Sequence, residues 1–222
     1  MRLNNCLKRS SIYWYIAISP LLFFGITAQA EDVVFDGMKV GGNALPNLWR
    51  VKVKEGKKNI YFSGSNKKKI CFISDKASFS IERKVDVDPE EFPVLKWEWK
   101  GIQLPKRGDL RNSETNDQAA QLFLVFDGWF PNKSISYVWD TNAPKGSTNL
   151  ENWLVIKVRV IVVESGVGIG EWKLNSRNIY DDYKNYFGSP IPKLIGVRLQ
   201  INSQHTGDRA EACFGALELS KQ

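Results

Sequence analysis

The sequence predicts an all-β protein built as a two-sheet antiparallel β-sandwich, with one short helix near residues 180–187. Three observations lead to this fold class. Apolar and polar residues alternate with a period of two in several segments, which is typical of half-buried strands. Clusters of glycine, asparagine, serine and aspartate separate these segments, as turns do. The chain also contains no heptad run, internal repeat or glycine-rich phosphate loop.

The predicted strands follow from this alternation. In segment 94–100, Leu95, Trp97 and Trp99 share one face, and charged residues occupy the other. Segment 119–126 is apolar on both faces, which favours a central strand. Many short strands of this kind favour a sandwich. The other predicted strands are 32–35, 49–53, 59–63, 69–74, 77–85, 134–139, 154–163, 171–174, 195–201 and 211–219.

One segment departs from the period of two. Ile179, Tyr183 and Tyr186 recur at helical spacing and Gly188 follows as a stop signal, so we expect a short helix over residues 180–187. Residues 101–118 form the longest irregular segment, and they are polar. A connection of this length in a compact domain is often functional or mobile.

Residues 1–30 have the pattern of a secretory signal peptide. Arg2, Lys8 and Arg9 precede an apolar run over residues 12–26, and a small-residue site follows at 28–30. A membrane anchor is the alternative. It is disfavoured because the apolar part is shorter than the roughly 20 residues that a spanning helix needs. We therefore expect cleavage near Ala30 and a periplasmic or secreted product.

Residues 31–222 are expected to form a single domain with no transmembrane segment. They contain 28 basic and 24 acidic residues, a formal charge of +4. Nucleic-acid-binding domains tend to concentrate basic charge on one face, so we expect no nucleic-acid partner. Lysines cluster at 52–58 and 67–69. We interpret them as solvated side chains that protect edge strands from aggregation, with an anionic glycan or membrane surface as the alternative.

Cys71 and Cys213 are the two cysteines that follow residue 30. In an exported protein they can form a disulfide across roughly 140 residues or remain two buried thiols, and the residues leave both open. No metal site is predicted, because the chain has one histidine and no CxxC pair. A structural calcium ion held by loop carboxylates is an alternative.

His205 lies in the polar segment 202–208 between two predicted strands. The segment contains Gly207, as a hairpin loop often does. No GxSxG elbow accompanies the histidine. We therefore interpret His205 as an exposed loop residue without a catalytic role.

Six sequence pieces occur in order along nearly the whole of residues 31–222. They are LWRVK (48–52), DPEEFPVLKWEWK (88–100), DQAAQLFLVFDG (117–128), YVWD (137–140), WKLNSRNIYDDYKNYFG (172–188) and IGVRLQINSQHTGDRAEACFGALEL (195–219). This ordered set resembles a family of exported bacterial proteins called domain of unknown function 3047. The resemblance implies a sandwich of jelly-roll type, without an established activity.

The chain departs from the pattern of that family in two places. The family tends to have two acids and a basic residue before and within the central strand, where this chain has Asp117, Gln118 and then Gln121. The last loop of the family is usually rich in aspartate, and residues 203–205 replace part of it with serine, glutamine and histidine. The resemblance thus implies that an acidic site of the family would be reduced here.

Carboxylates near predicted strand ends are the candidates for catalysis. A glycan hydrolase needs two carboxylates across a cleft, and Asp117, Asp127 and Asp182 are the candidates for such a pair. No spacing selects a pair among them. Loop acids are commonly solvated, and Asp182 also suits a helix start. A lyase would instead use a tyrosine with a basic partner, such as Tyr180 with Arg177.

Seven tryptophans follow residue 30, a surplus that suits contact with the apolar faces of sugars. Trp97 and Trp99 alternate with charged residues and are expected in the core. Trp129 follows the predicted central strand and Trp139 precedes Asp140, so we expect these tryptophans at the rim of a binding site. The full predicted ligand-binding set is Trp129, Trp139, Asp140, Arg177 and Tyr180.

These observations lead to one leading hypothesis and two alternatives. The leading hypothesis is an exported, single-domain sandwich that binds a carbohydrate or another ligand without a cofactor, its partner being a glycan or another component of the cell envelope. The first alternative is a glycan hydrolase or lyase that uses loop carboxylates. The second is a structural or assembly factor of the envelope. The sequence does not decide whether the protein is an enzyme.

Overall fold

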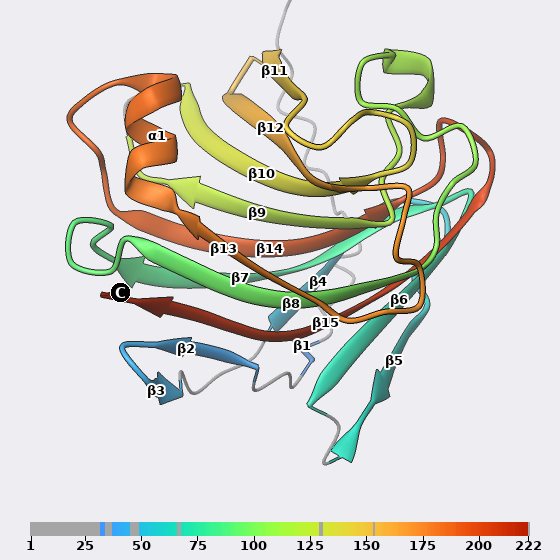
Figure 1. The fold of residues 1–222 in the computed structure, drawn as a ribbon, viewed down its shortest axis with the longest axis horizontal. Coiled ribbons are helices and arrows are strands. Elements are labelled where there is room, and N and C mark those ends of the chain that lie inside the picture. Colours follow the sequence, from blue (N-terminus) through green and yellow to red (C-terminus); the bar gives the residue numbers. More distant parts are fainter. Residues whose placement is uncertain are drawn as a thin grey trace, which may run out of the picture.

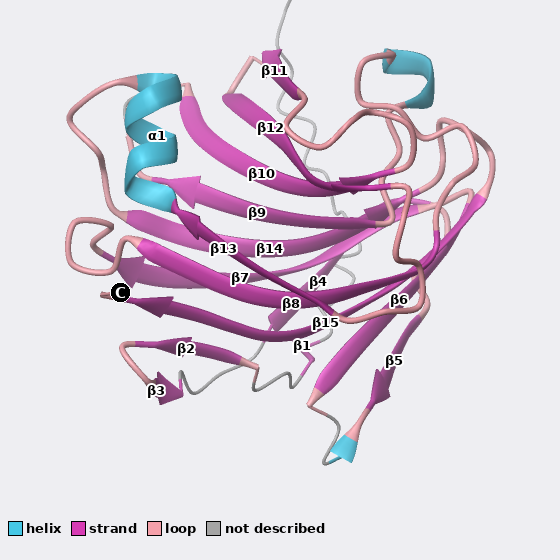
Figure 2. Cartoon of the chain, viewed as in Figure 1, coloured by secondary structure: helices cyan, strands magenta, loops and turns pink. Residues whose placement is uncertain are grey.

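The computed structural model describes residues 32–33, 37–44, 49–65, 68–128, 131–152 and 154–221. Two β-sheets pack face to face, and the helix α1 (Ile179–Phe187) lies at one end of the sandwich (Figures 1 and 2). The predicted fold class, an all-β sandwich with one short helix, is confirmed. The predicted signal peptide lies outside the described residues.

The first sheet has eight strands and contains the predicted central strand near its middle. Its strand order is β1 (Asp32–Val33), β4 (Trp49–Glu55), β7 (Ser78–Val87), β14 (Leu194–Asn202), β9 (Ala120–Phe126), β10 (Asn132–Asp140), β12 (Ile156–Ser165) and β11 (Thr148–Asn152). All pairs are antiparallel except β10 with β12. These two strands are parallel because β11 takes the edge position and β12 then returns beside β10.

The second sheet covers the inner face of the first. Its strand order is β13 (Lys173–Asn178), β8 (Val94–Gln103), β15 (Arg209–Ser220), β2 (Met38–Val40) and β3 (Asn43–Ala44). In addition, β6 (Lys69–Asp75) pairs with the first half of β15, and β5 (Ile60–Ser63) pairs with β6. The pair β15–β2 is parallel, and the other pairs of this sheet are antiparallel.

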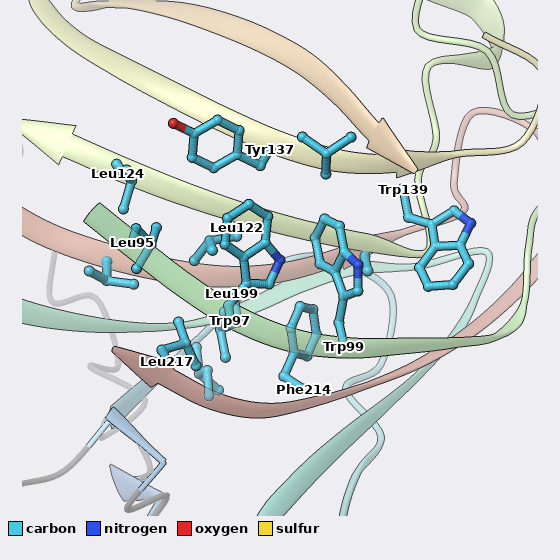
Figure 3. Close-up of a cluster of buried hydrophobic side chains, with 14 of the residues drawn as sticks. Leu95, Trp97, Trp99, Leu122, Leu124, Tyr137, Trp139, Leu199, Phe214 and Leu217 are labelled. Atoms are coloured by element: carbon cyan, nitrogen blue, oxygen red, sulfur yellow. The ribbon is translucent and has the colours of Figure 1, made fainter. Parts of the chain in front are cut away.

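The core between the sheets is rich in aromatic rings (Figure 3). Trp97 and Trp99 of β8 point into it, as the alternation predicts, and both are buried. The Trp97 ring stacks on Tyr137 of β10 with 5.1 Å between the ring centroids. Trp99 packs against Phe214 of β15 in its own sheet and against Trp139 of β10 in the other, so the aromatic side chains join both sheets. Burial of one such side chain stabilises the fold by roughly 2–3 kcal/mol.

The helix α1 begins and ends close to the predicted residues. The Asn178 side chain accepts a hydrogen bond from the backbone N–H of Asp181, as an N-cap does. Ile179 and Tyr183 face the core, and Gly188 has a positive φ of 81° directly after the last turn. Among the described residues, no helix is long and apolar enough to cross a membrane.

A disulfide joins Cys71 of β6 to Cys213 of β15. The sequence was compatible with either this bond or two free thiols, and the strand register explains why the bond forms. Because β6 and β15 pair antiparallel with Cys71 opposite Cys213, both side chains lie side by side in the second sheet. The bond therefore links the early strands of the domain to its last strand.

Tyr61 lies beside this disulfide, and its hydroxyl donates a hydrogen bond to Glu211 Oε1 at 2.8 Å. Burial and this carboxylate raise the pKa of Tyr61 from 10.0 to about 12. The contribution of Tyr61 to stability is thus complete below pH 10 and lost as the pH rises to about 12. We expect this pKa in a difference curve, obtained by subtracting the near-ultraviolet pH titration of Tyr61→Phe from that of the wild type. A difference curve centred at pH 10 would contradict the hydrogen bond.

Two expectations about strand ends and loops need correction. Leu154 was expected in a strand, but it is 87% exposed and β12 begins at Ile156. The segment 101–118 is not irregular throughout, because residues 101–103 belong to β8. Leu110 in the same segment is buried against Val138 and Val160 of the first sheet. Part of this connection is therefore packed onto the sheet, and it forms a wall of the site described next.

Candidate functional site

A groove runs over the outer face of the first sheet, the face that points away from the second sheet. It consists of two adjoining cavities of about 550 and 260 Å³, which share Val125 and Arg198. The larger cavity has a volume typical of ligand sites. We call this surface the sheet groove. Its floor is formed by β4, β7, β14, β9, β10 and β12.

The strand register gives the order of side chains across the floor. Each row crosses the strands from β4 or β7 towards β11, with all its side chains on the outer face. The rows are Arg50–Glu82–Arg198–Phe123–Ser136–Val160–Asn149, then Lys52–Ser80–Gln200–Gln121–Val138–Val162, and Lys84–Gly196–Val125–Ser134–Val158–Glu151. The floor thus changes from charged at β4 and β7 to polar and aromatic in the middle, and to apolar at β12.

A network of amide side chains forms one end of the groove. Asn202 Oδ1 accepts hydrogen bonds from Gln121 Nε2 and from the backbone N–H of Gln118. Gln200 Nε2 donates to Gln121 Oε1 at 3.4 Å. These side chains belong to β14, β9 and the segment before β9, so three parts of the chain are held in one arrangement. Amide groups both donate and accept hydrogen bonds, as sugar hydroxyls do.

Asp117 holds Asn202 of this network in place through a hydrogen bond. It is fully buried, and its Oδ1 accepts from Asn202 Nδ2 at 2.8 Å. Its Oδ2 accepts from the backbone N–H and the hydroxyl of Thr206, at 2.6 and 2.8 Å. The carboxylate therefore fixes both an amide of the groove and the loop at residues 203–208.

His205 forms part of the same end of the groove. Its Nδ1 is 3.2 Å from the Asn116 carbonyl oxygen and 3.7 Å from Asp117 Oδ1. The side chain is 40% exposed, so the expectation of an exposed loop residue agrees with its position. Asn116 Nδ2 also donates to Glu151 Oε1 of β11 at 2.7 Å. Residues 116–118, 204–205 and β11 thus form the wall of the groove.

The structure separates two of the three predicted catalytic carboxylates. Asp117 and Asp127 lie at opposite ends of β9, a strand of seven residues and about 23 Å. Asp127 is exposed, and Asp182 lies on α1 at the inner side of the first sheet. A hydrolase pair needs its carboxylates within about 10 Å. Asp117 and Asp127 are therefore too far apart to form such a pair, since they lie at different ends of the sandwich.

Two predicted ligand-binding residues are buried. Trp139 has no exposed surface and packs against Trp99, so its expected place at a rim is wrong (Figure 3). The alternation in β10 explains this, because Tyr137 and Trp139 share the inner face. Asp140 is also fully buried, and its carboxylate accepts backbone hydrogen bonds from Leu110 and Ala143. Burial raises the pKa of Asp140. Trp129 lies outside the described residues.

Arg177 and Asp182 come together with Tyr137 beside α1. Arg177 Nε and the Tyr137 hydroxyl both donate to Asp182 Oδ2, at 2.9 and 2.6 Å. Burial and the Asp182 charge raise the pKa of Tyr137 well above its ordinary value. Tyr180 is half-buried on the same helix. These residues tie α1 to β10 on the inner side of the sheet, away from the groove.

The prediction missed the residues of the groove floor. In segment 195–201, Arg198 and Gln200 alternate with apolar residues and so point away from the apolar face of their strand, and Gln121 is a polar residue within an apolar central strand. An amide on a central strand is an indication of a solvent-filled groove. That these side chains are neighbours depends on the pairing of β14 with β9. Among the residues described, no group of three or more potential metal ligands occurs.

Comparisons with solved structures find the same sandwich. The chain superimposes on the xyloglucanase domain of NopAA, a type three effector from Sinorhizobium fredii, with a TM-score of 0.50, 14% identity and coverage of 88% of this chain and 99% of that domain. A structure from a comparison of family 12 glycoside hydrolases gives a TM-score of 0.50, 7% identity and coverage of 87% and 96%. These likenesses concern the fold.

The comparison with curated proteins gives no match. A family model does match the chain over residues 47–218, which is most of the sandwich, from β4 to within β15. This agrees with the resemblance of the six ordered sequence pieces. The chain therefore belongs to the family of proteins of unknown function DUF3047.

Proposed function

We propose that this protein is exported and binds a carbohydrate chain along the sheet groove. The observation that carries the proposal is a pair of buried polar atoms lining the groove, Ser134 Oγ and Gln204 Oε1. Neither has a hydrogen-bond partner among the described residues. Buried polar atoms nearly always have a partner, and a water or a ligand hydroxyl in the groove is a partner of the kind these two atoms lack. Sugar hydroxyls and water supply both donors and acceptors.

The rest of the floor suits a sugar chain. Phe123 lies between Arg198 and Ser136 in its row and is partly exposed, so its ring offers an apolar surface for a sugar face. The amides of Gln121 and Gln200 lie in the next row. Because Asn202 and Asp117 hold this network, binding requires little reordering of side chains. The groove thus combines a ring with fixed polar groups, as ligand sites do.

The carboxylates of the groove favour binding over hydrolysis. Glu82 on β7 and Glu151 on β11 line the two cavities. Five strand spacings separate β7 from β11 in the sheet, about 24 Å along its surface. A glycosidase pair is separated by roughly 5–10 Å. The described groove therefore offers binding groups without a pair of acids at the spacing of that reaction.

Two further observations support parts of the proposal. The sandwich is shared with a xyloglucanase domain whose structure was solved in complex with cellobiose, so a saccharide is a ligand that this fold accommodates. The Cys71–Cys213 disulfide suits an oxidising compartment such as the periplasm or the outside of the cell. It thereby supports the expected export, with a glycan of the envelope or surroundings as partner.

The test is calorimetry with neutral and acidic oligosaccharides on wild type and Phe123→Ala. We expect binding by the wild type and at least about fivefold weaker binding by the variant, because the sugar face loses its ring. Phe62→Ala is the matched control, since Phe62 is an exposed phenylalanine of the second sheet. It should bind like the wild type. Absence of binding to every oligosaccharide would contradict the proposal and favour a role in envelope assembly.

A further inference from the structure

The larger cavity of the sheet groove has a strongly basic lining. In the register, Arg50 faces Glu82 and Glu82 faces Arg198, while Lys84 and Val125 lie on either side of Gly196. Gly196 has no side chain, so a depression opens between its neighbours. The cavity there has a volume of about 550 Å³, and Lys52 also lines it. We call it the basic cavity.

The charges of the basic cavity do not cancel. Glu82 is the single carboxylate of the lining, and it already pairs with Lys52 at 2.8 Å and with Arg198 at 3.1 Å. Arg50 and Lys84 form no ion pair with any residue that the structure describes. The lining therefore keeps a surplus of positive charge. A concave surface with one sign of charge concentrates ligands of the opposite sign.

Arg198 is held in place for contact with an anion. Its Nη2 donates to Glu82, and its guanidinium carbon lies 5.7 Å from the centre of the Phe123 ring. Its Nε is buried and has no acceptor among the described residues. A guanidinium held in a fixed orientation binds a carboxylate through directed, charge-assisted hydrogen bonds.

We propose that the basic cavity binds the carboxylate of an acidic sugar, so that the groove selects a uronate-containing glycan. This inference rests on the proposed glycan binding and adds the class of sugar. Arg198 donates to the carboxylate, and Lys84 and Arg50 supply positive charge around it. Phe123 and the amides of Gln121 and Gln200 contact the adjoining sugar units.

The first experiment compares an oligogalacturonate with the same oligosaccharide after reduction of its carboxyl groups. Calorimetry on the whole protein should give at least about tenfold tighter binding of the acidic form, because charge-assisted hydrogen bonds are lost on reduction. The preference should decrease with added salt, since exposed charges are screened. Equal binding of both forms would overturn the inference and leave the proposed glycan binding intact. Absence of binding by either form would contradict both.

The second experiment changes the cavity itself. Gly196→Val fills the depression; the nearest atoms to an added Cβ are 3.5 Å away or more, and the glycine φ is not positive, so the fold should tolerate it. Lys84→Gln removes one charge. Both variants should lose about tenfold or more of the affinity for oligogalacturonate. The matched control Lys39→Gln removes the same charge from β2 of the second sheet and should bind like the wild type.

Competition with inorganic sulfate and phosphate tests whether the cavity selects a sugar carboxylate or binds any anion. If sulfate or phosphate displaces oligogalacturonate when the two are present at equal concentration, the cavity is a general anion site and the uronate assignment is wrong. If the two variants bind oligogalacturonate as the wild type does, the basic cavity is not the site of the carboxylate. Thermal unfolding of each variant shows whether a loss of binding reflects the cavity or the fold.

Discussion

Replacing both Cys71 and Cys213 by alanine is expected to lower the free energy of unfolding by about 5 kcal/mol. The disulfide spans a sequence separation of 142 residues. In the chain-entropy model, a loop of this length restricts the unfolded chain by about that amount at room temperature. The free energy of unfolding of a domain is roughly 5–15 kcal/mol, so the variant should lose at least a third of it. Urea unfolding followed by tryptophan fluorescence measures the change.

Reduction of the wild type provides the control for this prediction. The reduced protein should unfold at nearly the same urea concentration as Cys71→Ala/Cys213→Ala, because both lack the same constraint. Thiol labelling of the unreduced, denatured protein followed by peptide mapping should leave Cys71 and Cys213 unmodified. Labelling at these two residues, or equal stability of the double variant and the oxidised wild type, would refute the stabilising role of the bond.

Asp117→Ala is expected to destabilise the protein by roughly 3–5 kcal/mol and to abolish binding in the groove. Three donors lose their acceptor: Asn202 Nδ2, the Thr206 N–H and the Thr206 hydroxyl. An unsatisfied buried donor costs about 1–3 kcal/mol. Asn202 then no longer holds Gln121, so the amide network loses its arrangement. Chemical unfolding and calorimetry with oligosaccharides measure the two effects.

Asp127→Ala is the matched control for Asp117→Ala, because it removes the same group from the other end of β9. Asp127 is exposed, so the expected change in stability is within about 0.5 kcal/mol. Asp117→Asn keeps the volume but places an amide group opposite either Asn202 or Thr206, and we expect an intermediate loss. If Asp117→Ala were as stable as the wild type, Asp117 would not have the supporting role that its contacts indicate.

The fold was predictable because its signals are local. The alternation in segment 94–100 places Trp97 and Trp99 in the core, where they are found. Gly188 ends α1 as predicted, and the structure shows that Asn178 caps its start. The same alternation, followed along β10, would have placed Trp139 on the inner face. Its assignment to a rim relied on its closeness to a turn, and the strand periodicity overrides that.

The candidate site was less predictable because it is made of long-range pairs. Asp117 and Asp182 were candidates for catalysis and Asp140 for ligand binding, but all three are buried and hold loops or the helix in place. From the sequence, a buried structural carboxylate looks the same as a catalytic one at a strand end. Only the partners distinguish them: backbone N–H groups for Asp140, and Arg177 with Tyr137 for Asp182.

By itself, the sequence determined the all-β class, the inward face of β8, the helix and the family to which the chain belongs. These properties depend on residues two, three or four positions apart, or on ordered local segments. The tertiary structure alone decided that Cys71 meets Cys213, that Arg198 meets Glu82 and Phe123, and that Gly196 opens a basic cavity. The reason is physical: sheet neighbours come from distant parts of the chain, and their register is set by the packing of the whole core.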